Sequence, residues 1–137
     1  VIEPDNSEIK ESLKLLRAAK SVEMLETGLN EYNAKKYNLA LKVFNEAIAN
    51  DSQNGYAYYY RGMTYEALGK NLDAVNDYKK SIEKSPEIYD AYYALAVNYE
   101  VLKKYPEAKK AYQKFLELAK DKNDEYVKYA KERVKKL

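Results

Sequence analysis

Apolar and small side chains recur along this chain every three or four residues, the spacing that gathers them on one face of an α-helix. Segments with this spacing come in pairs. The first members of the pairs cover residues 22–34, 56–68 and 90–102, and the second members cover residues 38–50, 72–84 and 106–119. No segment has the features of a β-strand. The pattern predicts an all-α protein that contains three helix pairs.

Polar breaks divide these segments. The breaks within the pairs are expected at Lys35-Lys36, Gly69-Lys70 and Lys103-Lys104. Residues 51–55 and Ser85-Pro86 have the composition of turns and separate one pair from the next. Pro106 falls in the first turn of its helix, where the missing N–H leaves no hydrogen bond unmade. The pairs are therefore expected to be joined by short loops.

The three helix pairs are copies of one unit, because residues of the same kind recur at a step of 34 positions. Each unit combines small residues with an aromatic residue. The series are Gly28, Gly62 and Ala96; Ala40, Ala74 and Ala108; Phe44, Tyr78 and Tyr112; and Met24, Tyr58 and Tyr92. A small residue lets two helices approach, and a ring one turn away fills the space beside it. The repeat is a pattern of packing rather than of catalysis.

The step and these residues resemble the tetratricopeptide repeat, in which an aromatic residue, a Leu-Gly pair and a Tyr precede an Ala, a Phe and a closing Pro. The second unit matches at Tyr58, Gly62, Tyr65, Ala74, Tyr78 and Pro86. The third unit matches at Tyr92, Leu95, Ala96, Tyr99, Ala108 and Tyr112. Departures from the pattern are Thr27, Glu31, Ser52, Arg61 and Lys120. The resemblance implies an α-solenoid of three antiparallel helix pairs whose first helices line a concave groove.

We expect one domain made of five parts. They are an N-terminal helix in residues 1–20, repeats in residues 21–54, 55–88 and 89–122, and a capping helix in residues 123–137. The N-terminal helix is expected to start at Asp5-Asn6-Ser7-Glu8. A helix that continues into the first repeat is favoured over one that breaks near Lys20-Ser21, because no Gly or Pro lies between Ser7 and Thr27.

The last residues have the pattern of an amphipathic helix. Tyr126, Tyr129, Ala130 and Val134 fall on one side of it, and charged residues fall mostly on the other. A helix with one apolar side can cover the exposed end of a repeat array and keep it soluble. We therefore expect residues 123–137 to cap the third repeat.

The composition excludes much of enzyme chemistry. The chain has 16 Tyr but no His, Cys or Trp. Without imidazole and thiol groups it has no Ser–His pair, no thiol nucleophile and none of the usual zinc ligands. Gly69-Lys70 and residues 51–55 only superficially resemble a phosphate loop and a calcium loop, and both are interpreted as turns. We expect no enzyme, no cofactor and no metal site.

The charge argues against a nucleic-acid partner. The chain carries 24 basic and 22 acidic residues, a net charge of +2. Basic residues gather near the C-terminus, but acidic residues are interleaved with them, which favours a solvated cap over a site for nucleic acid or an anionic membrane. No apolar run in this sequence is long enough to span a bilayer, and its first residues do not have the charged-then-apolar pattern of an export leader, although such a leader could have been removed before Val1. We expect a soluble protein, with the cytoplasm favoured over an exported location.

If the resemblance holds, the residues that face the groove can be located by their places in each first helix. They are Leu25, Glu26, Leu29, Tyr32, Tyr56, Tyr59, Tyr60, Met63, Glu66, Asp90, Tyr93, Val97 and Glu100. The same face also includes Val22, Asn33, Ala67, Ala94 and Val101. For Tyr32, Tyr56, Tyr59, Tyr60 and Tyr93, exposure in the groove is favoured over packing between first helices. This lining predicts an adaptor that binds an apolar or amphipathic protein segment carrying some basic residues.

A subfamily of tetratricopeptide co-chaperones grips the C-terminal carboxylate of heat-shock chaperones with Lys, Asn and Arg at set groove places. Those places here hold Leu25, Leu29, Tyr60, Asp90 and Ala94. The carboxylate clamp is therefore absent, and the charge of Asp90 would repel a carboxylate.

Self-assembly is the alternative function. Ile9, Leu13 and Leu16 form an apolar stripe on the N-terminal helix. This stripe could dock into the groove of a second copy or pair with its counterpart across a two-fold axis. The chain would then act as an oligomerisation module.

Overall fold

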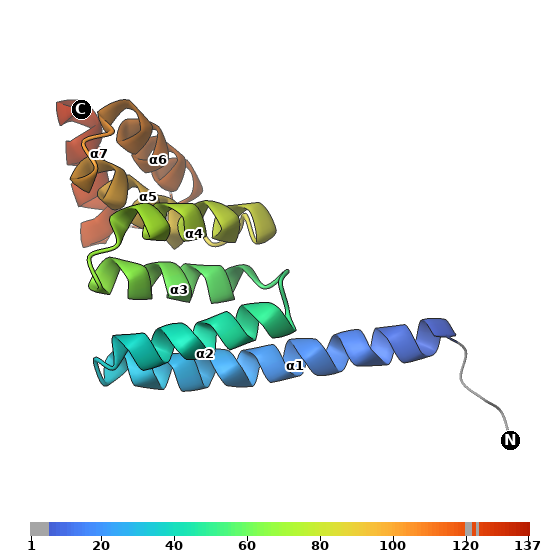
Figure 1. Ribbon diagram of the computed structural model, residues 1–137. Coiled ribbons are helices and arrows are strands. Elements are labelled where there is room, and N and C mark those ends of the chain that lie inside the picture. The colour runs from blue at the N-terminus through green and yellow to red at the C-terminus, as the bar shows by residue number, and fades with distance from the viewer. Residues whose placement is uncertain (1–5, 120–121, 123) are drawn as a thin grey trace, which may run out of the picture.

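A computed structural model describes residues 6–119, 122 and 124–137, and that part of the chain folds into helices without strands. The helices are α1 (Asn6–Asn33), α2 (Tyr37–Asn50), α3 (Gly55–Ala67), α4 (Asn71–Lys84), α5 (Asp90–Val101), α6 (Tyr105–Leu118) and α7 (Glu125–Lys136). Figure 1 shows consecutive helices running in opposite directions. The predicted all-α solenoid is confirmed.

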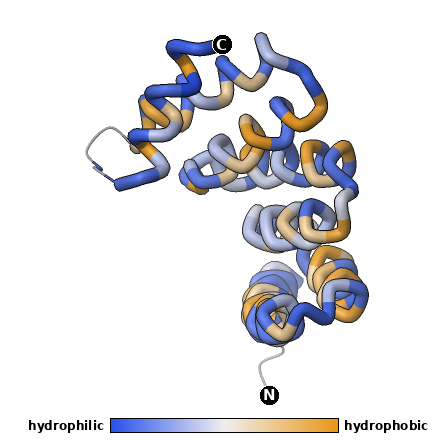
Figure 2. The backbone as a smooth tube through the Cα atoms, turned by 90° about the vertical axis from the view of Figure 1, so that its left-hand side faces the viewer, coloured by the Kyte–Doolittle hydropathy of each residue, from blue (hydrophilic) through white to orange (hydrophobic). Residues whose placement is uncertain are grey.

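The helices pack as three pairs, α1 with α2, α3 with α4, and α5 with α6. Contacts between α2 and α3 and between α4 and α5 join the pairs into one stack. Seen from the side, this stack is curved (Figure 2). A curved stack of helix pairs has a concave side, and the first helix of each pair supplies that side with its residues.

Small residues allow the close approach of the two helices in each pair. A methyl group at Gly62 would lie 2.9 Å from Cε1 of Tyr78, and one at Gly28 would collide with the ring of Phe44. The rings of Phe44, Tyr78 and Tyr112 are fully buried. The repeated small and aromatic residues therefore form the core, as the sequence pattern predicts.

The first helices end at three equivalent positions with left-handed backbone. Lys35, Gly69 and Lys103 have φ angles of 61°, 76° and 60°. A residue in this conformation closes a helix because its N–H can bond back to the last turn, and Gly adopts it at the lowest cost. The breaks predicted at these positions are present, although only the second repeat has a Gly there.

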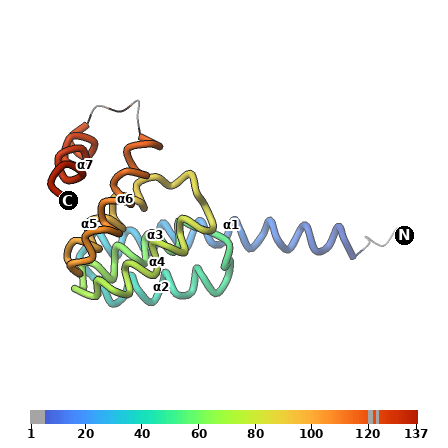
Figure 3. Tube along the Cα trace, turned by 90° about the horizontal axis from the view of Figure 1, so that it is seen from above, coloured from blue at the N-terminus to red at the C-terminus, as the bar shows by residue number. Residues whose placement is uncertain are grey.

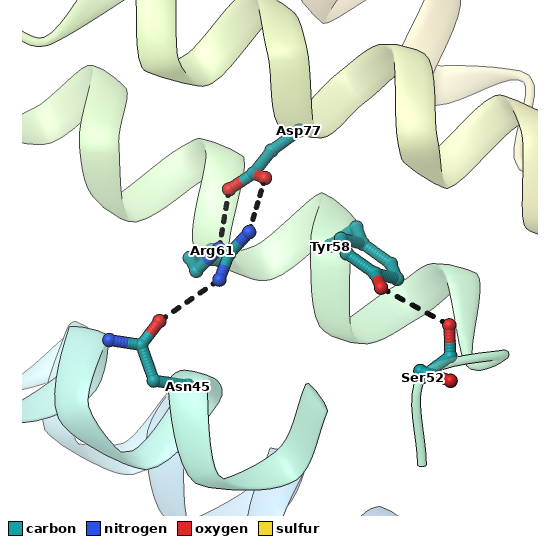
Figure 4. Close-up of polar contacts among 5 residues, drawn as sticks. All are labelled: Asn45, Ser52, Tyr58, Arg61 and Asp77. Carbon is teal, nitrogen blue, oxygen red and sulfur yellow. Dashed lines mark hydrogen bonds and ion pairs between the residues drawn. The ribbon is translucent and has the colours of Figure 1, made fainter. Parts of the chain in front are cut away.

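Arg61, one of the departures from the repeat pattern, is held in a network of polar contacts. Its guanidinium donates two hydrogen bonds of 2.7 Å to the carboxylate of Asp77 and one of 3.0 Å to Asn45 (Figure 4). The Asp77 side chain is only 6% exposed. The rings of Tyr58 and Tyr65 lie within 6 Å of the guanidinium carbon. Arg61, which occupies the Leu place of the repeat pattern, thus joins α2, α3 and α4.

The N-terminal helix continues into the first repeat without a break. α1 is 28 residues long and passes through Lys20-Ser21. Its first half extends past the end of the stack (Figures 1 and 3). Residues 6–20 are all exposed, and the buried residues of α1 begin at Ser21. Asp5, the first residue of the expected helix start, lies with residues 1–4 outside the described residues. The expected boundary between the third repeat and the capping helix falls between residues 122 and 123, and residue 123 is also outside them.

α7 covers the last repeat. It packs against α6 and buries Val127 and Ala130 in the core cluster that extends back to Ala74. The Asp124 side chain begins the helix by accepting a 3.0 Å hydrogen bond from the N–H of Val127. Its apolar side thus faces the solenoid, the arrangement of a cap.

Candidate partner-binding groove

The concave side of the solenoid has a large hollow between α1 and α3. We call it the N-terminal hollow. It encloses about 580 Å³ and is lined by Val22, Leu25, Glu26, Leu29, Asn30, Asn33, Asn54, Tyr56 and Tyr60. A hollow of this size with mostly apolar walls and a few polar groups is typical of a binding site.

The walls of the N-terminal hollow differ in how much surface they offer. Val22 is 61% exposed and Tyr56 is 44% exposed, whereas Leu25 is only 7% exposed and belongs to the core around Phe44. Asn54 is engaged as the cap of α3, where its side chain accepts a 3.0 Å hydrogen bond from the N–H of Tyr56. Val22 and Tyr56 therefore carry the most accessible apolar surface.

The tyrosines of α3 pack against one another as well as facing the groove. The ring of Tyr60 lies 6.2 Å from Tyr56, 5.5 Å from Tyr59 and 6.0 Å from Phe44. Each side chain is fixed by its neighbours, so little side-chain entropy remains to be lost when a partner binds. These contacts lie within α3 and between α3 and α2, and Tyr56 and Tyr60 also line the N-terminal hollow.

A second, smaller hollow lies toward the C-terminus, and we call it the C-terminal hollow. It encloses about 200 Å³ and is lined by Tyr59, Asp90, Tyr93, Ala94 and Tyr126. The rings of Tyr126 and Phe115 lie 5.1 and 5.2 Å from the ring of Tyr93. Burial raises the pKa of Tyr59, and the negative charge of Asp90 raises it further, so the Tyr59 hydroxyl stays neutral. We refer to the two hollows together as the groove.

Two of the four carboxylates expected to face a partner are bound within the chain. Glu66 accepts hydrogen bonds from Nδ2 of Asn98 at 2.5 Å and from the Tyr78 hydroxyl at 3.3 Å. Glu100 accepts bonds of 2.9 and 2.6 Å from the guanidinium of Arg133 on α7, and these bonds lower its pKa. Glu66 thus connects the second repeat to the third, and Glu100 connects the third repeat to the capping helix.

Glu26 and Asp90 are the carboxylates left to meet a partner. Both are exposed, and neither forms an ion pair with any residue in the described part of the chain. One lines each hollow, and neither hollow has a Lys or Arg in its lining. The groove is thus apolar with one free negative charge in each half.

The structure brings most of the expected groove residues together. Leu25, Glu26, Leu29, Tyr56 and Tyr60 line the N-terminal hollow, and Tyr59, Asp90 and Tyr93 line the C-terminal hollow. The others line neither hollow. The ring of Tyr32 lies 5.3 Å from the ring of Tyr37, measured between ring centroids. Met63 and Val97 pack against the core. Glu66 and Glu100 form the hydrogen bonds described above.

Three lining residues were not expected from the sequence. Asn30 lies beside the predicted face of α1, and Asn54 precedes α3, where its type is typical of a helix cap. Tyr126 comes from α7, which lies outside the repeats. The repeat register carries no information about Tyr126, and only its place on the apolar side of the capping helix indicated that it faces the protein.

Other chemistry is not indicated by the described residues. Among them, no group of three or more acidic side chains is placed to hold a metal ion. None of their helices is both long and apolar enough to cross a membrane.

The curved stack and its lined concave side agree with the family comparison. The family model for the tetratricopeptide repeat matches residues 25–75 and again residues 61–124. Together the two matches span well over half of the chain. The protein belongs to the tetratricopeptide repeat family, whose members are generally non-catalytic protein-interaction modules.

A relative and two solved structures show what the chain is similar to. The Dictyostelium discoideum protein named STIP1 homolog is 40% identical over 70 residues, which cover 51% of this chain and 12% of that protein. The Arabidopsis OM64 tetratricopeptide domain has a TM-score of 0.80 and 26% identity, covering 88% of this chain and 98% of the domain. The first tetratricopeptide domain of Spaghetti (RPAP3), bound to the HSP90 peptide SRMEEVD, has a TM-score of 0.78 and 24% identity. The match covers 86% of this chain and 93% of that domain.

Proposed function

We propose that this protein is an adaptor that binds an apolar, basic segment of a partner protein along its groove. The observation that carries the proposal is the N-terminal hollow, an open space of about 580 Å³ with exposed apolar walls and an unpaired carboxylate at Glu26. Burial of a partner's apolar side chains there would supply most of the binding free energy.

The charge of the groove argues against an acidic partner. The Spaghetti (RPAP3) domain binds a peptide that ends in EEVD. The places where the co-chaperone subfamily holds its cationic and amide clamp carry Leu25, Leu29, Tyr60, Asp90 and Ala94 in this chain. A carboxylate brought there would find no Lys or Arg in the lining of either hollow and would be repelled by the negative charge of Asp90. We infer that the partner carries Lys or Arg beside its apolar residues.

A helical segment suits this groove. An amphipathic helix presents apolar residues at positions i, i+4 and i+7, and a groove receives them as a row of anchors. Lys or Arg next to that row would reach Glu26 and Asp90. Both carboxylates are exposed, and charge at exposed positions changes the rate and salt dependence of binding more than the final affinity.

Titration with labelled peptides tests this function. The first probe is an amphipathic peptide with Leu at i, i+4 and i+7 and Lys beside each Leu. The second has Glu in place of Lys, and the third is SRMEEVD. We expect saturable binding of the Lys peptide, about tenfold or more weaker binding of the Glu peptide, and no measurable binding of SRMEEVD.

Two variants locate the site. Val22→Lys with Tyr56→Lys removes the most exposed apolar walls of the N-terminal hollow, and it should weaken binding of the Lys peptide by about tenfold or more. The matched control is Leu39→Lys with Leu72→Lys, which changes leucines that are 45% and 57% exposed but line neither hollow. Equal binding by both variants would refute the groove as the site.

Reversal of the free charges isolates the electrostatic part. Glu26→Lys with Asp90→Lys should weaken binding of the Lys peptide and reduce its dependence on salt. Glu46→Lys with Glu87→Lys makes the same change in charge at exposed carboxylates outside the hollows and should leave binding nearly unaltered. If the two double variants behave alike, the preference for a basic partner is wrong.

A further inference from the structure

The first half of α1 is exposed and meets the rest of the described chain beside residues 50–54. Residues 6–20, which we call the projecting segment, are all exposed and extend past the end of the stack (Figure 3). Ile9, Leu13, Leu15 and Leu16 are 43%, 45%, 62% and 65% exposed. Asn50 donates a hydrogen bond to the carbonyl oxygen of Arg17, and Lys10, Lys14 and Arg17 line a hollow of about 410 Å³ with residues 50–54.

The projecting segment carries two parallel rows of side chains. The apolar row is Ile9, Leu13 and Leu16, and the basic row is Lys10, Lys14 and Arg17. Each basic residue follows an apolar one directly, so the basic row runs beside the apolar row at about 100° around the helix. The basic row forms no ion pair with any described residue.

The projecting segment supplies the basic side chains that the groove lacks. The groove is apolar and has free carboxylates at Glu26 and Asp90 but no Lys or Arg in its lining. The projecting segment is apolar and carries four basic residues against two acidic ones, Glu8 and Glu11. The two surfaces are complementary both in apolar character and in charge.

A segment cannot reach the groove of its own chain. α1 is one continuous helix from Asn6 to Asn33, so its first half points along the same axis as the half that forms a wall of the groove. To enter, it would have to break α1 near Lys20. A groove that receives it must therefore belong to another molecule.

We propose that the projecting segment of one copy of this chain docks into the groove of a second copy. This inference rests on the proposed function and names a second copy of the chain as an occupant of the groove. Each chain has one segment and one groove, so reciprocal docking closes a two-fold dimer with two equal contacts. If the angle between two copies prevents the second contact from forming, the same contact links successive molecules into an open filament.

Docking into the groove explains the segment better than pairing of two segments with each other. In such a pair, like-charged basic rows would lie along both helices. Docking instead places the basic row near carboxylates and covers the walls of the N-terminal hollow. It also supports a helix that would be marginal in isolation, since helices of about 15 residues are barely stable in water.

Light scattering after size exclusion tests the proposal on the full chain. Across a range of concentrations, the measured mass should rise from that of one 15.9 kDa chain to at least twice that value. Leu13→Asp with Leu16→Asp should keep the protein monomeric, because it places charge in the apolar row without touching the core. Leu39→Asp with Leu72→Asp makes the same change at other exposed leucines and should associate like the wild type.

A mixing experiment identifies what the segment contacts. Val22→Lys with Tyr56→Lys, the groove variant, should be monomeric alone, as should the Leu13→Asp, Leu16→Asp variant. Mixed in equal amounts, they should form a heterodimer, because the intact segment of the groove variant can dock into the intact groove of the other. If the groove variant dimerises alone, the segments pair with each other and the proposal is overturned.

Other outcomes separate this proposal from the adaptor function. A wild type that stays monomeric at every concentration overturns self-association. If that monomer still binds the Lys peptide in the groove, the adaptor function stands without the self-association. If the wild type associates but the groove variant binds the Lys peptide normally, the adaptor function fails instead.

Discussion

Arg61 and Asp77 form an ion pair in the second repeat, and the two equivalent positions of the third repeat hold uncharged residues. Thirty-four positions later, the same two places hold Leu95 and Ala111. Burial raises the pKa of Asp77, while the hydrogen bonds from Arg61 act in the opposite direction. A buried ion pair with this balance contributes little net stability, because the loss of hydration offsets the attraction. Its removal should therefore be less harmful than the loss of either partner.

Substitution of the pair by the residues of the third repeat tests this balance. Arg61→Leu alone should lower the free energy of unfolding by about 2 kcal/mol, because it leaves the Asp77 carboxylate buried without a cation. Asp77→Ala should cost less, since Arg61 is 21% exposed and keeps its bond to Asn45. Arg61→Leu with Asp77→Ala should lie within about 1 kcal/mol of the wild type in urea denaturation. A double variant that loses the sum of the single losses would show that the two side chains act independently.

α7 is attached to the solenoid by an apolar face and by one charged contact to α5. The apolar part is the burial of Val127 and Ala130. The charged part is the pair of hydrogen bonds between Arg133 and Glu100, whose side chains are 23% and 18% exposed. Because Tyr126 lines the C-terminal hollow, the position of α7 also determines the shape of the groove.

Acid should weaken the attachment of α7. The bonds from Arg133 hold the pKa of Glu100 below its ordinary value of 4.5. A carboxylate whose pKa is lowered by folding stabilises the folded state above its unfolded pKa, and this contribution is lost as the pH falls through the folded pKa. Glu100→Gln should therefore lower the melting temperature at pH 7, and its difference from the wild type should shrink below about pH 4.5. Glu46→Gln, at an exposed carboxylate of α2, is the control and should show no such convergence.

The helices were predictable because their pattern repeats. The step of 34 residues located the breaks near Lys35, Gly69 and Lys103, and each lies where the structure turns. Local signals also explain the ends of helices, such as Asn54 and Asp124, whose side chains cap α3 and α7. What repeats in the sequence also repeats in space, so one register gives the arrangement of all three pairs.

The groove was predictable only where it follows the repeat. The walls from α1, α3 and α5 agree with the register, but Tyr126 and Arg133 come from a helix that has no counterpart in the repeat. The pairing of Glu66 with Asn98 crosses from one repeat to the next, and it depends on side-chain directions that spacing does not reveal. The free charge of the groove was therefore overestimated from the sequence.

At the scale of the molecule, the core is divided into two clusters of unequal size. The smaller one joins α1, α2 and the start of α3 around Phe44. The larger one extends from α4 to α7 and contains Tyr78, Tyr112 and Phe115. In a repeat protein each unit is stabilised mainly by its neighbours, so regions with less buried apolar surface can open first.

The division predicts that the N-terminal pair unfolds before the C-terminal helices. In hydrogen exchange at rising denaturant, peptides from α1 and α2 should lose protection before those from α5 and α6, and residues 6–20 should exchange fastest in monomeric protein. Phe44→Leu, which removes about 1 kcal/mol of packing, should lower protection in α1 and α2 with little effect on α6. Phe115→Leu is the matched change in the larger cluster and should do the reverse. If both variants lower protection equally throughout the molecule, the solenoid unfolds as one unit and the two clusters do not open separately.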